Sequence, residues 1–272
     1  MQDYLLKTYS RKNVLFKKGD GIWLYSDSGD KFLDCASGIA VNILGHCNKK
    51  LVKVLTEQAQ NLWHTSNLYR VENQEKLAKL LVEHTFADRV FFTNSGTEAI
   101  ECAIKMARVY HSKLNQERHE ILSFDGCFHG RSMAAISTSN SDKMKEGFGP
   151  LIPGCKSLGF NDRDALCQNI TNKTAAVIIE PIQGEGGIRS FSLEILKLIR
   201  SLCDDTGALL IIDEVQSGLG RSGKLFAHEW FNLKPDIMTI AKGIGGGFPL
   251  GACLSTENAS IGMVKGKHGS TY

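Results

Sequence analysis

The hydrophobic pattern of the chain changes near residue 89. Beyond that point, short apolar runs alternate with stretches whose apolar residues recur at helical spacing. The runs are rich in Val and Ile and lack period-two alternation, which is typical of strands buried on both faces of a largely parallel sheet. They are 89–93 (RVFFT), 120–124 (EILSF), 175–181 (AAVIIEP), 208–214 (ALLIIDE) and 236–242 (DIMTIAK). The pattern predicts a layered α/β domain.

Helical spacing is clearest in four stretches, which are 46–64, 72–85, 95–111 and 192–207. Residues 21–38 instead alternate apolar and polar positions around Asp-Ser-Gly-Asp, which predicts a hairpin. We therefore assign residues 1–45 to the N-terminal segment of a smaller α+β lobe and residues 46–272 to a large domain. Because the chain reaches Tyr272 without a closing helix, we expect a C-terminal lobe to follow it.

Composition narrows the class of protein. Hydrophobic residues make up 42% and charged residues 22%, values typical of a soluble globular chain. No apolar stretch approaches the roughly 20 residues of a membrane span, and the first residues lack the apolar core of a secretory signal. The net charge of +3 comes without a stripe of Lys and Arg, so no nucleic-acid partner is expected. The cysteines are scattered, which indicates a reducing, cytoplasmic compartment. The sequence has neither a CxxC nor an HExxH motif, so no metal site is expected.

Candidate chemistry follows the apolar runs, because ligands of open α/β sheets bind beyond the carboxyl ends of the strands. After RVFFT, Ser95 begins a predicted helix and Glu98 completes a capping box. The N–H groups of Gly96 and Thr97, with nearby hydroxyls, suit a phosphate at the positive end of that helix. An ordinary capped helix explains the same residues.

A carboxylate and an amine end two other runs. Asp213 follows ALLII, where a carboxylate needs a cationic partner, either on a ligand or on an arginine of the chain. Lys242 follows DIMTIA; an apolar site lowers the pKa of a lysine and makes it a candidate for Schiff-base formation, although a solvated lysine also fits. A phosphate site, an acid for a ring nitrogen and an imine-forming lysine are together what pyridoxal phosphate requires.

Two other motifs favour a nucleotide only weakly. Residues 218–223 (GLGRSG) match GxGxxG, but no strong helix pattern follows them. The overlapping stretch 218–225 nearly matches a P-loop, with Leu225 where a magnesium-binding hydroxyl is required. We expect neither to bind a nucleotide.

Several ordered motifs together resemble those of the class III (fold-type I) pyridoxal-phosphate aminotransferases, from about residue 10 to the last residue. They are LDCASGIAVNILGH, NSGTEAIECAIKMAR, FHGRSMAAIS, IIEPIQGEGG, IIDEVQSGLGRSGKLFA, AKGIGGGFPLGA and HGSTY. The resemblance implies an α/β fold with a mostly parallel central sheet flanked by helices. It also implies pyridoxal 5'-phosphate as cofactor and a homodimer whose active site is shared across the interface.

The resemblance assigns cofactor-binding roles to residues of these motifs. Lys242 is expected to form the Schiff base, Asp213 to pair with the pyridine nitrogen, and Gln216 to donate to the phenolic oxygen. Val215 and Phe128 are expected on the two faces of the ring. The remaining cofactor-binding residues are Gly96 and Thr97 at the phosphate, Thr271 at the phosphate of the neighbouring subunit, and Glu214 within the Asp213 motif.

The resemblance also assigns substrate-binding roles. Arg131 is expected to bind the α-carboxylate, Ser270 to contact substrate, and Glu185 to pair with an arginine beyond Tyr272 and release it to 2-oxoglutarate. The implied reaction is transfer of the δ-amine of N2-acetyl-L-ornithine to 2-oxoglutarate, giving N-acetyl-L-glutamate 5-semialdehyde and L-glutamate in arginine biosynthesis. Ornithine, succinylornithine, succinyl-diaminopimelate and 4-aminobutyrate remain alternative donors. A non-catalytic homologue and a nucleotide-binding protein are the alternatives from other classes.

Overall fold

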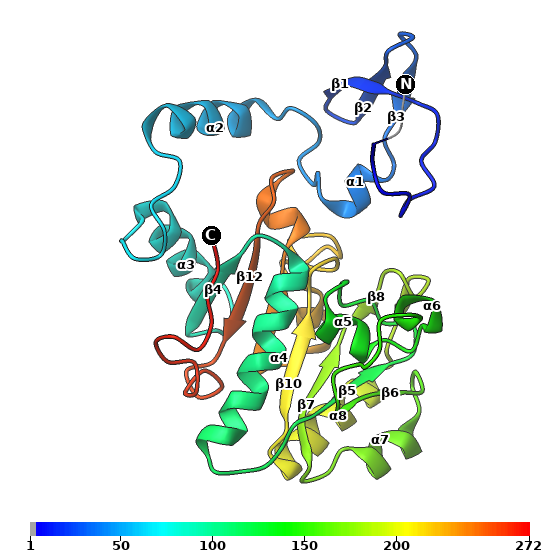
Figure 1. Ribbon diagram of the computed structural model, residues 1–272, viewed down its shortest axis with the longest axis vertical. Helices are drawn as coiled ribbons and strands as arrows, with labels where there is room; N and C mark the ends of the chain where they lie inside the picture. The colour runs from blue at the N-terminus through cyan, green and yellow to red at the C-terminus, as the bar shows by residue number, and fades with distance from the viewer. Residues whose placement is uncertain (1–3) are drawn as a thin grey trace. The chain divides into compact units, whose positions relative to one another are not determined.

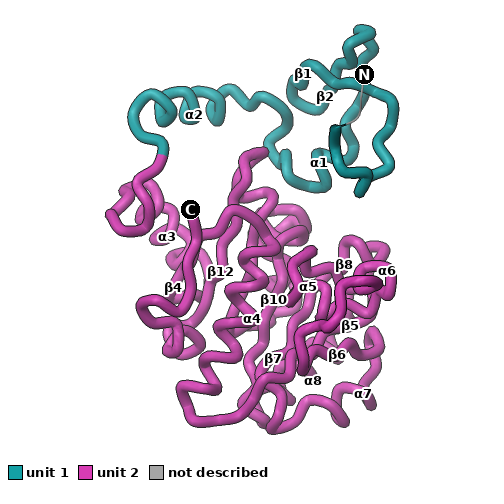
Figure 2. Tube along the Cα trace, in the orientation of Figure 1, with its two compact units in different colours: residues 1–63 teal, residues 64–272 magenta. Residues whose placement is uncertain are grey.

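The computed structural model describes residues 4–272, so the first three residues of the expected 1–45 segment lie outside the described part. Two compact units divide the chain, residues 1–63 and residues 64–272 (Figure 2). The division falls after a long helix rather than before it. Assignment of 1–45 and 46–272 to separate lobes stays a prediction.

The first unit contains a three-stranded antiparallel sheet. Its strands are β1 (Phe16–Asp20), β2 (Trp23–Ser26) and β3 (Lys31–Leu33), and its helices are α1 (Ser37–Ala40) and α2 (Lys49–Asn61). The pairing of β2 with β3 confirms the predicted hairpin. Helix α2 begins where the Asn48 side chain accepts hydrogen bonds from the N–H groups of Lys50 and Leu51, which satisfies two donors of its first turn.

The second unit is built on a seven-stranded sheet with the order β4-β12-β11-β10-β7-β5-β6 (Figure 1). The strands are β4 (Arg89–Thr93), β5 (Glu120–Phe124), β6 (Cys155–Leu158), β7 (Thr174–Ile179), β10 (Leu209–Asp213), β11 (Ile237–Ile240) and β12 (Gly251–Ser255). Strand β12 pairs antiparallel with both neighbours, and the other pairs in this sheet are parallel. The predicted mostly parallel sheet is therefore confirmed.

Helices cover both faces of this sheet. They are α3 (Glu72–Glu83), α4 (Gly96–Lys113), α5 (Met133–Thr138), α6 (Asp142–Lys145), α7 (Arg163–Asn169) and α8 (Leu193–Thr206). Consecutive strand residues point to opposite faces: Ile211 packs in a cluster with α4 and α5, whereas Ile212 packs in a cluster with α8. In Figure 1, α4 crosses the near face and α8 lies behind the sheet. Strands buried on both faces explain why the predicted runs lacked alternation.

The five predicted strands are present, and two more were missed. Strand β6 carries an exposed Lys156 within a run of only four residues. Strand β12 follows a glycine-rich turn, and its central Ala252 and Cys253 are weak indicators of a strand. Shorter elements complete the unit: β8 (Ile182–Gln183) with β9 (Arg189–Ser190), and the 3-10 helices η1 (Ala227–Phe231) and η2 (Lys242–Gly245).

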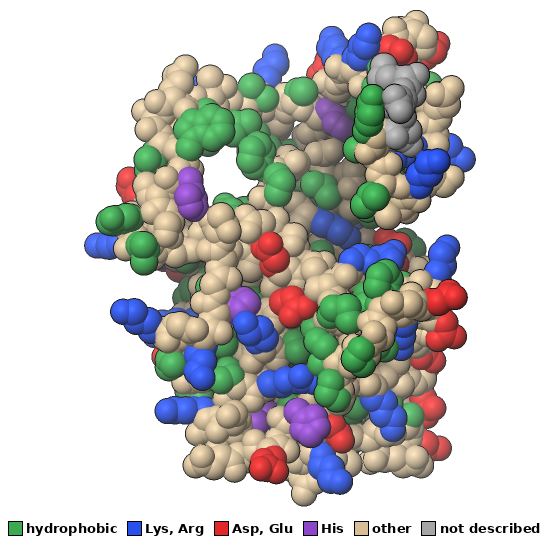
Figure 3. Space-filling view, in the orientation of Figure 1, with side chains coloured by type: hydrophobic (Ala, Val, Ile, Leu, Met, Phe, Trp, Pro, Cys, Tyr) green, Lys and Arg blue, Asp and Glu red, His purple; other side chains and the backbone are tan. Residues whose placement is uncertain are grey.

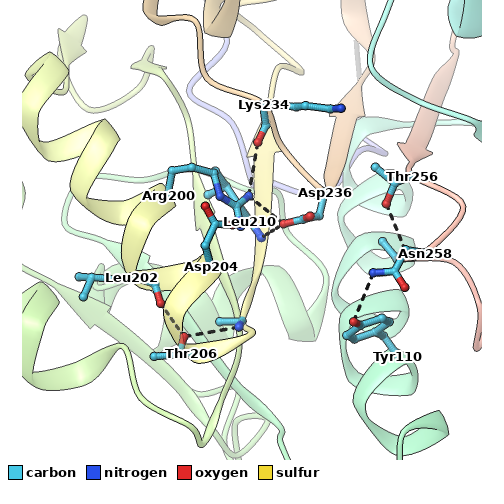
Figure 4. A network of polar contacts seen from close by, with 12 residues as sticks. Tyr110, Arg200, Leu202, Asp204, Thr206, Leu210, Lys234, Asp236, Thr256 and Asn258 are labelled. Atoms are coloured by element: carbon cyan, nitrogen blue, oxygen red, sulfur yellow. Dashed lines mark hydrogen bonds and ion pairs between the residues drawn. The ribbon is translucent and has the colours of Figure 1, made fainter.

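A polar network joins α8 to the amino ends of β10 and β11 (Figure 4). A guanidinium nitrogen of Arg200 lies 2.9 Å from Asp236 Oδ2, and the same oxygen accepts from the N–H of Leu210 at 2.7 Å. Arg200 also pairs with Asp204 on its own helix at 2.7 Å. These bonds fix helix to strand at the amino edge of the sheet.

The surface of the 64–272 unit mixes both signs of charge on the face shown in Figure 3. Among the described residues, no helix has both the length and the apolar character needed to cross a membrane. The same part of the chain holds no group of three or more His, Cys, Asp or Glu side chains arranged to bind a metal ion.

Candidate active site

The carboxyl ends of the parallel strands meet at one edge of the sheet (Figure 1). Strand β4 ends at Thr93, β10 at Asp213 and β11 at Ile240, directly before Ala241 and Lys242. The antiparallel β12 begins at the same edge, where Gly251 pairs with Thr93. This topology brings together the segments that follow three predicted strands.

Helix α4 presents its N-terminus at this edge. The Ser95 hydroxyl accepts from the N–H of Glu98 at 3.3 Å, and the Ser95 carbonyl accepts from the N–H of Ala99. The N–H groups of Gly96 and Thr97 have no acceptor among the described residues, so they are available to an anion. The expected capping box forms only by half, because Glu98 Oε2 accepts from the N–H of Asn94 instead of Ser95.

Asp213 is buried, with a side chain 3% exposed. Its Oδ1 accepts from the N–H of Val215 at 3.0 Å and from the Thr239 hydroxyl at 3.2 Å. Its Oδ2 lies 2.7 Å from Nδ1 of His129. The chain therefore offers His129 as the partner of Asp213, whereas an arginine was the partner within the chain expected from the sequence.

The segment that carries Phe128 is held against the same edge. The N–H of Phe128 donates to Glu180 Oε2 at 3.0 Å. Glu180 is 6% exposed, and its burial raises the pKa of this carboxyl to about 7. The charge of Asp213 adds to this rise, whereas His129 opposes it. Burial thus makes Glu180 a carboxyl that changes charge near neutral pH.

Lys242 opens η2 directly after β11, with φ at +51°, a left-handed backbone conformation that non-glycine residues seldom adopt. Burial lowers the pKa of its amine, while Asp213, Glu185 and Glu180 act in the opposite direction. Among the described residues, no hydrogen bond or ion pair engages this amine. The site therefore holds a partly desolvated amine that is free to react.

Close backbone approaches bring the Val215 and Gln216 side chains into place. A Cβ at Gly96 would lie 2.8 Å from Val215 Cγ1, so this contact requires glycine. A Cβ at Gly184 would overlap the Gln216 side-chain amide. Two of the glycines in the predicted motifs thus make room for predicted cofactor-binding side chains.

Arg131 and Glu185 are exposed. The guanidinium carbon of Arg131 lies 5.5 Å from the centroid of the Phe128 ring. No ion pair of Arg131 occurs among the described residues, which leaves its guanidinium available to a carboxylate. Glu185 is near enough to Lys242 to affect the pKa of its amine.

Ser270 and Thr271 lie beside the start of α4. They line a cavity of about 210 Å³ together with residues that follow β4 and begin α4, among them Asn94 and Glu98. The Asn67 side chain donates to the carbonyls of Ser270 at 3.3 Å and Tyr272 at 2.6 Å. Roles for Ser270 and Thr271 at the active site of a neighbouring subunit stay predictions.

Glu214 points away from Asp213, as consecutive residues of an extended segment do. It is fully buried; its Oε1 accepts from the N–H of His228 at 2.7 Å, and its Oε2 accepts from the Ser217 hydroxyl at 2.5 Å. These contacts stabilise the segment after β10. The predicted contact of Glu214 with a cofactor stays a prediction. The position of its side chain, against Ser217 and His228, does not favour such a contact.

The profile of a known family, Aminotransferase class-III, matches residues 6–272. The chain belongs to the class-III aminotransferases. It is 57% identical over 269 residues to the acetylornithine aminotransferase of Rhodobacter capsulatus, covering 98% of this chain and 68% of that protein. The acetylornithine aminotransferase of Agrobacterium fabrum is 56% identical, with 98% and 67% covered.

Solved aminotransferases share the fold. The ornithine aminotransferase of Toxoplasma gondii superimposes with a TM-score of 0.94 at 30% identity, over 98% of this chain and 65% of that one. The N-acetylornithine aminotransferase of Stenotrophomonas maltophilia gives a TM-score of 0.81 at 40% identity, over 93% and 65%. This chain therefore spans about two thirds of the length of its curated relatives and slightly less of the solved chains. The expected fold-type I architecture is confirmed.

Class-III aminotransferases use pyridoxal phosphate, and one Toxoplasma gondii structure is described with partial occupancy of this cofactor at its active site. The residues of this chain fit the group. Two free N–H groups at a helix N-terminus suit its phosphate, a buried carboxylate suits its ring nitrogen, and an unpaired amine suits its aldehyde.

Three polar residues of the site were missed by the sequence analysis, namely His129, Glu180 and Thr239. Each is buried and contacts Asp213 or the Phe128 segment. Glu180 directly follows β7 and Thr239 lies within β11, whereas His129 belongs to the quoted motif FHGRSMAAIS, five residues after β5. Nothing in the spacing indicated that His129 meets Asp213, 84 positions further along the chain.

Proposed function

We propose that this class-III aminotransferase transfers the δ-amine of N2-acetyl-L-ornithine to 2-oxoglutarate, as a cytoplasmic homodimer in arginine biosynthesis. The observation that carries the proposal is that one sheet edge holds both the buried Asp213 carboxylate and a partly buried Lys242 amine that no described residue engages. Identity of 57% to a protein named acetylornithine aminotransferase supports this donor.

Bound pyridoxal phosphate supplies an electron sink that stabilises negative charge at the amine-bearing carbon of the substrate. Lys242 would hold the cofactor through its amine, and its Nζ would move the proton at that carbon. Its lowered pKa favours this role, because a general base works best when its pKa lies near the operating pH. Asp213 holds a positive charge at the ring nitrogen, and Gly96 and Thr97 hold the phosphate through their N–H groups.

The exposed rim orients the substrates. Arg131 binds the α-carboxylate of the acetylated donor, since a planar guanidinium offers two parallel hydrogen bonds. Glu185, close to Lys242, balances the charge of the site as donor and acceptor alternate. Phe128 and Val215 would pack against the cofactor ring, and Gln216 would donate a hydrogen bond to its phenolic oxygen. Ser270 and Thr271 complete the site of the partner subunit.

A visible absorption spectrum of the full-length protein with pyridoxal phosphate tests this function. We expect a visible band that decays on addition of N2-acetyl-L-ornithine and returns with 2-oxoglutarate. Lys242→Ala, compared at equal cofactor loading, should lose turnover by at least about 10²–10⁴-fold, the usual contribution of one general acid–base group.

Each other outcome has a defined meaning. A band that responds only to ornithine, succinylornithine, succinyl-diaminopimelate or 4-aminobutyrate would keep the transamination and replace the donor. No band with added pyridoxal phosphate would overturn the enzymatic function and favour a non-catalytic homologue. Turnover that survives in Lys242→Ala without added amine would remove this lysine from its role.

A further inference from the structure

The hydrogen bonds of Asp213 leave one acceptor site unused. A carboxylate offers about four lone-pair sites, two on each oxygen. Oδ1 already accepts from Val215 and Thr239, and Oδ2 accepts from His129. The described residues therefore supply three donors, and the remaining site lies on Oδ2. The oxygen held by His129 is the one with capacity for a further donor.

The proton in this contact belongs to His129. Because a carboxylate only accepts, the 2.7 Å contact requires a proton on Nδ1 of the imidazole. Nε2 of His129 is buried and has no hydrogen-bond partner among the described residues. The short hydrogen bond of the ring is therefore the one to Asp213, and the Cys127 side chain is a second polar neighbour.

The backbone around His129 fixes where the ring lies. On one side, the N–H of Phe128 donates to Glu180. On the other, Gly130 adopts φ +122°, and a Cβ there would overlap Thr97 Oγ1. The segment is therefore tied both to β7 and to the start of α4, so the imidazole cannot shift without disturbing both.

The titratable groups close to the ring, Cys127, Asp213 and Glu180, favour a protonated imidazole. Burial lowers the pKa of His129, but the adjacent Cys127 and Asp213 outweigh it and raise this pKa well above its ordinary value. Glu180 also faces His129 closely enough to be affected by its charge. A ring that keeps its Nδ1 proton keeps Asp213 ionised.

We propose that His129 is a positioning residue for transamination. Its Nδ1–H holds Oδ2 of Asp213, so that the carboxylate stays ionised and the unused acceptor site of Oδ2 keeps a fixed direction toward the cofactor. The inference rests on the proposed function, because the donor that fills this site is the protonated ring nitrogen of pyridoxal phosphate. A packing role alone would require only the volume of the ring and no proton on Nδ1.

Two substitutions separate these roles in the full-length protein. His129→Leu keeps an apolar volume and removes the donor, whereas His129→Asn keeps an N–H donor near the position of Nδ1. We expect His129→Leu to lower kcat by about 10–100-fold, as the loss of a hydrogen bond to a charged group does, with KM changed less than about twofold. His129→Asn should retain most of kcat.

Two readouts do not depend on turnover. In the cofactor-free protein, proton NMR should show a downfield Nδ1–H resonance that His129→Leu abolishes. In the loaded protein, the midpoint of the pH titration of the visible band should shift in His129→Leu and return toward wild type in His129→Asn. Thermal unfolding of both cofactor-free variants shows whether they are folded.

The outcomes decide the proposal. Equal losses in the two variants, or a His129→Leu variant that is less stable but has unchanged kcat and band midpoint, would overturn it while leaving the proposed function intact. A wild-type protein that forms no visible band with pyridoxal phosphate would overturn both.

Discussion

The two edges of the central sheet carry similar acid–cation pairs that differ in how deeply they are buried. At the amino edge, Asp236 and Arg200 lie 2.9 Å apart, with side chains 26% and 20% exposed. At the carboxyl edge, Asp213 and His129 lie 2.7 Å apart, with side chains 3% and 0% exposed. Described residues supply three donors to Asp213 and two to Asp236, so both carboxylates keep acceptor capacity, but of the two only Asp236 is exposed enough for water to fill it.

The amino-edge pair stabilises the fold, whereas the carboxyl-edge pair belongs to the candidate active site. The amino-edge pair joins a helix to two strands through bonds among protein groups only (Figure 4). The carboxyl-edge pair lies close enough to the Lys242 amine to affect its pKa, and no described residue engages that amine. Burying a charge with spare hydrogen-bonding capacity is costly, so we expect it where a ligand supplies the missing partner.

The largest effect is expected from Asp213→Asn. This substitution preserves size but removes the charge that holds a protonated ring nitrogen, so kcat should fall by about 10²–10³-fold, as on loss of one preorganised electrostatic contact. Steady-state kinetics of the loaded enzyme checks it. Thermal unfolding of the cofactor-free protein is the control. A kcat within threefold of wild type would contradict a role of Asp213 in the reaction.

Asp236→Asn should have the opposite profile. Loss of the charge at the amino edge weakens the bonds to Arg200 and Leu210, so the free energy of unfolding should fall by about 1–2 kcal/mol, a modest value because the pair is partly exposed. Urea unfolding of the cofactor-free protein measures it. A large drop in kcat at unchanged stability would show that the amino edge takes part in the chemistry.

Glu180→Gln should change the pH dependence of stability. Burial raises the pKa of Glu180 to about 7, so between its ordinary value and pH 7 the folded chain holds a proton that the unfolded chain has released. The stability of the wild-type protein should therefore fall as pH rises through this window, by at most about 1.4 kcal/mol per pH unit.

The glutamine variant removes this contribution, because it does not titrate. Its stability should show a flatter pH dependence in urea unfolding across the same window. Glu185→Gln, which changes an exposed carboxylate in the next turn, is the matched control and should keep the slope of the wild type. Parallel profiles for Glu180→Gln and wild type would contradict the raised pKa.

Much of the sheet and part of the site could be predicted from the sequence because both depend on local signals. Apolar runs rich in Val and Ile predicted β7, β10 and β11, and Asp213 and Lys242 were notable as charged residues ending such runs. Those signals need only the residues themselves and their immediate neighbours.

The rest depends on long-range pairing or on side-chain direction. His129 meets Asp213 only because β5 and β10 flank β7 in the sheet order. Glu214 was grouped with the cofactor-binding residues from its motif, although an extended backbone turns its side chain toward His228. Strand β12 was missed because its partners, rather than its own composition, specify it.

The position of β4 has a consequence for synthesis of the chain. This edge strand pairs with β12 and with no other strand of the sheet, and β12 is made about 160 residues later, roughly 10–30 s at ordinary rates of translation. During that interval Arg-Val-Phe-Phe-Thr has no strand partner on the nascent chain. Unpaired apolar strands promote aggregation, so β4 stays exposed to such contacts until β12 has been synthesised.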